Sequence, residues 1–116
     1  NIIQTSHRYI LYWLGHSLSS IVLLNIQKHI KIYGKVQGVG CRNWLQSFAI
    51  EYGVFGWVKN NVNGEVEAVL IGQEEVVSSL IEQCYMGPPN SNVEKILIED
   101  SDDIYDLRSF EIVTDN

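Results

Sequence analysis

The stretch from Gly34 to Arg42, GKVQGVGCR, contains the residue types that hold an anion in other proteins. Its three glycines allow positive φ angles, and successive backbone N–H groups of such a turn can point inward to form an anion-binding concavity. Arg42 adds a guanidinium whose planar set of donors matches two phosphate oxygens. The pattern predicts a phosphate cradle, although a glycine-rich turn by itself more often only connects a strand to a helix.

The segments on either side place this stretch between a strand and a helix. KHIKIYGKV, residues 28–36, alternates apolar and polar residues as a half-buried strand does. Apolar residues at helical spacing then predict a helix from about Arg42 to Tyr52, which Gly53 ends. The free N–H groups and the partial positive charge at the start of this helix would add to an anion site.

The rest of the chain predicts four more strands and one more helix. Asn63-Gly64 is a strong hairpin signal between the first two of these strands. In chain order the predicted elements are the strand VFGWVKN, the strand EVEAVLI, a helix from Glu74 to Met86, the strand NVEKILIED and the short strand SFEIV. This β-α-β-β-α-β order with a final strand predicts an α+β fold, a split β-α-β sandwich with both helices on one face of an antiparallel sheet.

The other face of this sheet is expected to be bare and apolar. Its outward positions include Tyr33, Phe55, Trp57, Val69 and Ile71. Residues 1–27 form an N-terminal extension whose apolar residues recur at the spacing of an amphipathic helix, and which is too short and too diluted by serines for a membrane span. The extension either covers the bare face or mediates self-association there, or it is a flexible tail.

The composition argues against several classes of protein. A formal charge of −6 disfavours broad binding to nucleic acids or anionic membranes, which require basic surfaces. The histidines are scattered, Cys41 and Cys84 lack metal-ligand spacing, and no nucleotide or dinucleotide fingerprint occurs, so we expect neither a metal site nor a cofactor. Two cysteines are too few for a secreted mini-protein, and we expect a cytoplasmic location.

Two motifs resemble the signatures of the acylphosphatase family. YGKVQGVGCR is similar to the first signature, which ends in V-Q-G-V-x-F-R. GWVKNNVNGEVEAVLIG, residues 56–72, matches every fixed position of the second: G-W-V-x-N, three residues, G-x-V, five residues, G. Their separation and the order of the elements are also those of the family, so residues 28–116 are expected to form an acylphosphatase-like domain with a ferredoxin-like fold.

The resemblance implies an enzyme that hydrolyses the carboxyl–phosphate bond of acyl phosphates without a metal or other cofactor. By position, Arg42 matches the arginine that binds the phosphate, and Asn60 matches the asparagine that orients the attacking water. The loop that binds the phosphate in the family corresponds to Gln37, Gly38, Val39, Gly40, Cys41 and Arg42. The implied partner is therefore a small acyl phosphate.

Cys41 departs from the family pattern, which has phenylalanine at this position. A smaller side chain there implies a looser cradle or one repacked by a neighbour such as Trp44, at a cost of ~3 kcal/mol if nothing fills the space. Cys41 and Cys84 are also expected to approach each other. A thiol at a helix N-terminus beside Arg42 would have a lowered pKa and be redox-sensitive; two buried and inert thiols are the reading that we favour.

Two further functions are compatible with this topology. A domain of the same fold could bind an acyl or carbamoyl phosphate without turnover, as at the head of larger hydrogenase-maturation proteins. An RNA-recognition module shares the topology, but the aromatic pattern of such modules is absent and the net charge is −6. The enzyme is the leading hypothesis.

Overall fold

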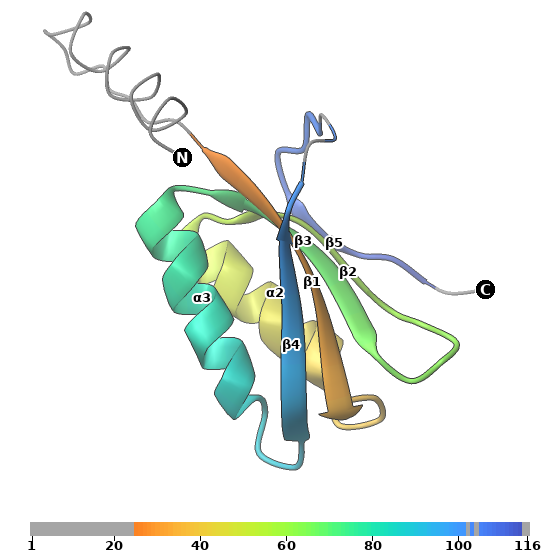
Figure 1. Ribbon diagram of the computed structural model, residues 1–116. Coiled ribbons are helices and arrows are strands. Elements are labelled where there is room, and N and C mark those ends of the chain that lie inside the picture. Colours follow the sequence, from red (N-terminus) through yellow and green to blue (C-terminus); the bar gives the residue numbers. More distant parts are fainter. Residues whose placement is uncertain (1–24, 102, 104, 115–116) are drawn as a thin grey trace, which may run out of the picture.

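The computed structural model describes residues 25–101, 103 and 105–114, which form five strands and two helices (Figure 1). The elements are β1 (Ile26–Lys35), α2 (Cys41–Tyr52), β2 (Phe55–Asn60), β3 (Val66–Gly72), α3 (Glu74–Met86), β4 (Asn92–Asp100) and β5 (Phe110–Ile112). The predicted split β-α-β fold with a short last strand is confirmed, and α2 begins at Cys41 rather than at Arg42.

The strands form one sheet in the order β4-β1-β3-β2-β5, and α2 and α3 lie together on one of its faces (Figure 1). The first four strands pair in antiparallel fashion, but β5 pairs parallel to β2 through Gly56 and Phe110. The sheet is therefore mixed, and the expectation of a purely antiparallel sheet is corrected at this edge. Because β4 ends where β2 begins, a connection that crosses the sheet at that end makes β5 start there and run with β2.

The core lies between the helices and the inner face of the sheet. The fully buried side chains include Ile30, Ile32, Leu45, Val58, Val66, Leu70, Val77 and Leu80. Each buried aliphatic side chain of this size contributes about 1.5–3 kcal/mol to stability. This packing confirms the predicted inward face of β1, and it fixes the two helices against the sheet.

The outer face of the sheet is less exposed than expected. Val69 and Ile71 are buried, whereas Tyr33, Phe55 and Trp57 are half-buried. On this side, Gln27 donates hydrogen bonds to the main-chain carbonyls of residues 101 and 103, which follow β4. The expectation of a bare face is thus corrected.

The predicted N-terminal extension, residues 1–27, overlaps β1, which already begins at Ile26. Its predicted amphipathic helix and self-association through it fall on residues 1–24, outside the described residues. Within the described part of the chain, neither helix has the length and apolar character needed to cross a membrane.

Candidate active site

The candidate site lies at the end of the sheet where three strands finish. Strands β1, β2 and β5 run in the same direction, so the loop after β1, the last residue of β2 and the end of β5 meet at one edge. We call residues 37–42 the cradle and residues 61–65, which join β2 to β3, the hairpin turn. The topology brings the two sequence motifs together at this edge.

The glycines of the first motif are required for two different structural reasons. Gly38 and Gly40 have φ angles of 77° and 81°, and a Cβ at either position would meet nothing within 4 Å. These two are needed for their backbone conformation, and the space beside them is open to a ligand. Gly34 instead lies against β4, where a Cβ would be 2.1 Å from the carbonyl oxygen of Asn92.

The first turn of α2 contributes unsatisfied backbone donors to the cradle. The first helical hydrogen bond runs from the N–H of Trp44 to the carbonyl of Gly40 at 3.0 Å, so the preceding N–H groups have no acceptor within the helix. No side chain caps this end, and its first turn has no acidic residue. The positive end of the helix dipole therefore remains available to an anion.

A pocket of about 170 Å³ joins the cradle to the end of β2. Its lining residues are Val36, Gly38, Gly40, Cys41, Arg42, Asn43, Asn60 and Ile112. The lining has one cation and no carboxylate, although the whole chain is acidic. Four of the six predicted cradle residues line it; Gln37 and Val39 do not, and Val39 packs against the core.

The Arg42 and Asn60 side chains are half-buried and make no hydrogen bond or ion pair with the described residues. The Arg42 guanidinium offers a fork of donors, whereas the Asn60 amide offers both a donor and an acceptor. A phosphate held by the first would leave the second free to orient a water molecule. The structure thus places both residues in one pocket, and the roles that the motifs predict for them stay predictions.

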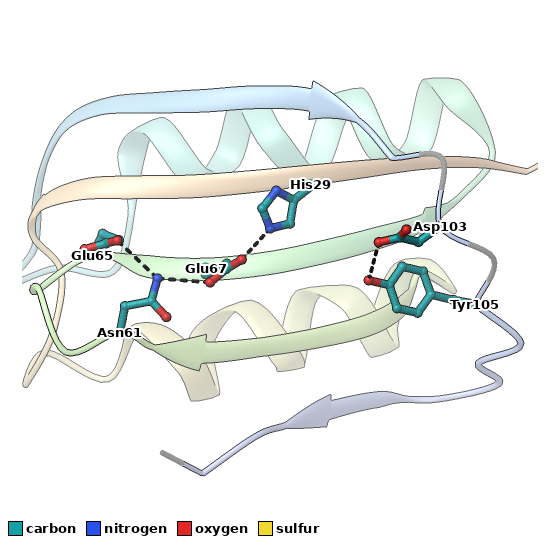
Figure 2. A network of polar contacts seen from close by, with 6 residues as sticks. All are labelled: His29, Asn61, Glu65, Glu67, Asp103 and Tyr105. Carbon is teal, nitrogen blue, oxygen red and sulfur yellow. Dashed lines mark hydrogen bonds and ion pairs between the residues drawn. The ribbon is translucent and has the colours of Figure 1, made fainter. Parts of the chain in front are cut away.

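A polar network that sequence analysis missed begins at Asn61, the residue after Asn60 (Figure 2). Asn61 Nδ2 donates to Glu65 Oε2 at 3.1 Å and to Glu67 Oε1 at 3.0 Å. The second oxygen of Glu67 lies 2.5 Å from His29 Nε2. Burial by itself raises the pKa of Glu67, but the hydrogen bonds from Asn61 and His29 outweigh it, and the pKa is lowered. The hairpin signal Asn63-Gly64 sets Asn61 opposite Glu65, but only the β1–β3 register brings His29 within reach.

A wider depression of about 580 Å³ borders the same end of β2 on its other side. Its lining residues are Lys31, Lys59, Asn60, Asn61, Val62, Asn63, Glu65, Val113 and Thr114. Asn60 belongs to both linings, so the two hollows meet at this residue.

The two thiols do not have the reactive character that a helix N-terminus predicts. Cys41 and Cys84 are both free and buried in the core. Burial raises the pKa of Cys41 to about 11, and burial together with the nearby Cys41 raises the pKa of Cys84 to about 12. The favoured reading of two buried and inert thiols is confirmed, and the alternative of a lowered pKa at Cys41 is wrong, because burial disfavours the thiolate.

Cys41, which stands where the family has phenylalanine, belongs to the same core cluster against which Trp44 and Phe48 pack. Trp44 is half-buried against the core, and its ring lies 4.9 Å from that of Phe48 in an edge-on arrangement.

Among residues 25–101, 103 and 105–114, no three His, Cys, Asp or Glu side chains are grouped so as to hold a metal ion.

Comparison with known proteins agrees with this fold. The family model described as Acylphosphatase matches residues 28–112. The match covers most of the chain and includes both motifs, so the protein belongs to the acylphosphatase family.

Individual relatives are similar over most of the same region. An acylphosphatase of Rhodopseudomonas palustris is 44% identical over 84 residues, which are 72% of this chain and 85% of that protein. The crystal structure of acylphosphatase from Bacillus subtilis is 36% identical, with a TM-score of 0.73, and the match covers 78% of this chain and 99% of that one. Full-length HypF, solved in a phosphate- and nucleotide-bound form, is 26% identical with a TM-score of 0.75, over 83% of this chain but 13% of HypF.

Proposed function

We propose that the protein is an acylphosphatase that hydrolyses the carboxyl–phosphate bond of acyl phosphates to a carboxylate and inorganic phosphate. One observation carries the proposal: Arg42 and Asn60, with their side chains free of partners among the described residues, line one pocket at an uncapped helix N-terminus. The names and structures of the relatives support the same reaction.

In the proposed complex the phosphoryl group is held by the cradle. Backbone N–H groups of residues 37–42 and the Arg42 guanidinium donate to its oxygens and spread their charge. Phosphoryl transfer requires little covalent chemistry from a protein, so positioning and charge stabilisation supply most of the catalysis. Arg42 and the helix dipole together provide the positive charge that the reaction needs, and we propose no metal.

Asn60 is proposed to orient the attacking water in line with the bond that breaks. Its amide can accept from water and donate to it while remaining neutral. Because the pocket lining contains no carboxylate or histidine, the proton of the water is proposed to pass to a phosphate oxygen of the substrate. The leaving carboxylate is stable as an anion and needs no acid.

The acyl part of the substrate is proposed to extend past Asn60. The wider depression begins there, so a ligand anchored by its phosphate in the smaller pocket has room for its remainder beside the hairpin turn. Free thiols are usual in the reducing cytoplasm, and we keep that compartment as part of the proposal.

A domain that binds the same ligand without turnover is the second candidate. The observation in its favour is the similarity to a small part of HypF, a protein solved with phosphate bound. Such a module would need the cradle and Arg42 but not the water-orienting role of Asn60.

The test is hydrolysis of benzoyl phosphate in the presence of EDTA by the wild type, Arg42→Ala and Asn60→Ala. We expect turnover by the wild type and a loss of ~10²–10³-fold in rate in each variant, the usual cost of one well-placed donor. Arg108→Ala and Asn92→Ala serve as controls, because both side chains are exposed and lie outside the pocket lining.

Two results would contradict the proposal in different ways. A folded wild type that binds phosphate but turns over no acyl phosphate would identify the binding module instead. A pH–rate profile with a limb that belongs to a histidine or carboxylate of the enzyme would contradict the proposed proton transfer to the substrate.

A further inference from the structure

The side chain of Gln37 joins the two halves of the candidate site. Its Nε2 donates to the main-chain carbonyl of Asn61 at 2.7 Å and to that of Glu65 at 3.0 Å. We infer that Gln37 is a positioning residue, which holds the hairpin turn and therefore Asn60 at a fixed place relative to the phosphate cradle. This inference rests on the proposed function and adds to it a residue that acts through another.

The chemistry of the partners fixes the orientation of the amide. Both partners are carbonyl oxygens, which only accept, so the NH₂ group of Gln37 must face the turn. Each carbonyl also accepts one backbone hydrogen bond, from Gly64 N at 3.1 Å and from Asn61 N at 2.8 Å respectively. Gln37 thus uses the second acceptor position of two carbonyls on opposite sides of the turn.

The sheet does not provide this connection by itself. Strands β1 and β2 are not neighbours, because β3 lies between them, so no ladder hydrogen bonds join the end of β1 to the end of β2. Gln37 directly precedes Gly38 of the pocket lining, and Asn61 directly follows Asn60. Among the described residues, the cradle and the hairpin turn are joined by two side-chain hydrogen bonds, and Gln37 donates both of them.

The residue type matches this role. Gln37 itself is absent from the pocket lining, so its side chain is engaged with the turn and not with the space for the ligand. The turn also has hydrogen bonds of its own, in which Asn61 donates to Glu65 within the turn and to Glu67 of β3 (Figure 2). Loss of Gln37 should therefore shift an intact turn away from the cradle rather than unfold it.

The variant Gln37→Met keeps the length of the side chain and removes both donors. We expect kcat for benzoyl phosphate to fall by about 10²-fold, the cost of a misplacement of about 1 Å at a reacting group. The inhibition constant of inorganic phosphate should stay close to that of the wild type, because Arg42 and the cradle amides remain. A loss in kcat without a loss in phosphate binding is a result that general destabilisation would not give.

The matched control is Gln46→Met. Gln46 Nε2 donates to the carbonyl of Phe110 at 2.8 Å, so this variant also removes a glutamine bond that joins two elements, but away from the pocket lining. For Gln46→Met we expect a lower melting temperature and an unchanged kcat.

A further variant, Gln37→Glu, replaces the amide by a carboxyl group. When ionised, this carboxylate would face two carbonyl oxygens, so kcat should be low at neutral pH. At acidic pH the protonated carboxyl can donate one hydrogen bond, so kcat should recover in part.

The inference is overturned if Gln37→Met keeps the kcat of the wild type, or if kcat and phosphate affinity fall in parallel. A second measurement is independent of turnover. In ¹H–¹⁵N spectra, the side-chain NH₂ signal of Asn60 should move in Gln37→Met and not in Gln46→Met. If the wild type hydrolyses no acyl phosphate, the proposed function fails, and an Asn60 signal that stays in place would separately overturn the role of Gln37.

Discussion

Arg42, in the first turn of α2, and Asn60, the last residue of β2, line the same pocket although they lie at opposite ends of two consecutive elements. The parallel course of β1 and β2 brings the two residues to one edge, and Gln37 links the loop of the first to the turn after the second. The proposed roles of phosphate binding and water orientation thus fall on different segments of the chain. Substitutions can therefore be chosen that affect one and leave the other.

Arg42→Lys tests whether the shape of the guanidinium matters as well as its charge. Lysine keeps the charge but loses the planar fork that matches two phosphate oxygens. We expect kcat/KM for benzoyl phosphate to fall by at least ~10-fold, because one charge-assisted hydrogen bond contributes about 1.5–3 kcal/mol. The melting temperature should not change, because Arg42 makes no hydrogen bond or ion pair with the described residues. A variant with full activity would show that charge alone suffices.

The two motifs were readable from sequence because their spacing follows from local rules. Gly38 and Gly40 require positive φ, Asn63-Gly64 makes a tight hairpin, and alternation places Asn60 on the inner face with the buried Val58. Local chemistry of this kind predicts the elements and the glycine turn, whereas the roles of Arg42 and Asn60 were implied by the resemblance to the family. The same rules predict the helix Glu74–Met86 and the strand Asn92–Asp100 with the bounds that the structure has.

What was missed depends on distances between segments that are remote in sequence. The link from Gln37 to the hairpin turn and the contact of His29 with Glu67 require the register of three strands, which no local pattern gives. For Cys41 the sequence left two alternatives open, and the favoured one, a buried and inert thiol, depends on packing that its position on the helix does not by itself predict. The parallel pairing of β5 likewise depends on the path of the β4–β5 connection.

Two glycine substitutions should distinguish a glycine that is required for its positive φ angle from one that is required because a side chain would not fit. At Gly40, a Cβ would meet nothing within 4 Å, so Gly40→Ala should cost only the left-handed backbone conformation, about 1–2 kcal/mol of unfolding free energy. At Gly56, a Cβ would lie 1.8 Å from the carbonyl oxygen of Val69 in the paired strand. Gly56→Ala must therefore break the β2–β3 pairing or prevent folding. Chemical denaturation of both variants tests this order, and equal losses would contradict it.

Because Cys41 and Cys84 are buried, we expect both thiols to be unreactive in the folded protein and the free energy of unfolding to fall at high pH. Because the pKa values of Cys41 and Cys84 are raised in the folded state to about 11 and about 12, the folded protein holds their protons more tightly than the unfolded chain. Their contribution is therefore fully present below the unfolded pKa of about 8.5 and is lost as the pH rises through the folded values. We expect a disulfide reagent at pH 8 to label neither thiol in the native protein and both after unfolding. Rapid labelling of the native protein would contradict the assigned burial.

Glu67 should contribute stability at neutral pH and lose it in acid. Its side chain is 16% exposed, and hydrogen bonds from Asn61 and His29, with the charges of His29 and Lys59, lower its pKa against the effect of burial. A lowered pKa means that the contribution is present above the unfolded value of about 4.3 and is lost as the pH falls through the folded value. Glu67→Gln keeps the shape, so at pH 7 it should lower the melting temperature of the protein.

The pH dependence of that loss is the decisive observation. At pH 3 part of the Glu67 carboxylate is protonated in the wild type, so its contribution to the free energy of unfolding is reduced. The difference in melting temperature between the wild type and Glu67→Gln should therefore be smaller than at pH 7. Glu94→Gln is the matched control, since Glu94 is exposed and makes no ion pair with the described residues. It should leave the melting temperature unchanged at both pH values. A difference for Glu67→Gln that persists undiminished at pH 3 would mean that its carboxylate charge is not what stabilises the network beside the site.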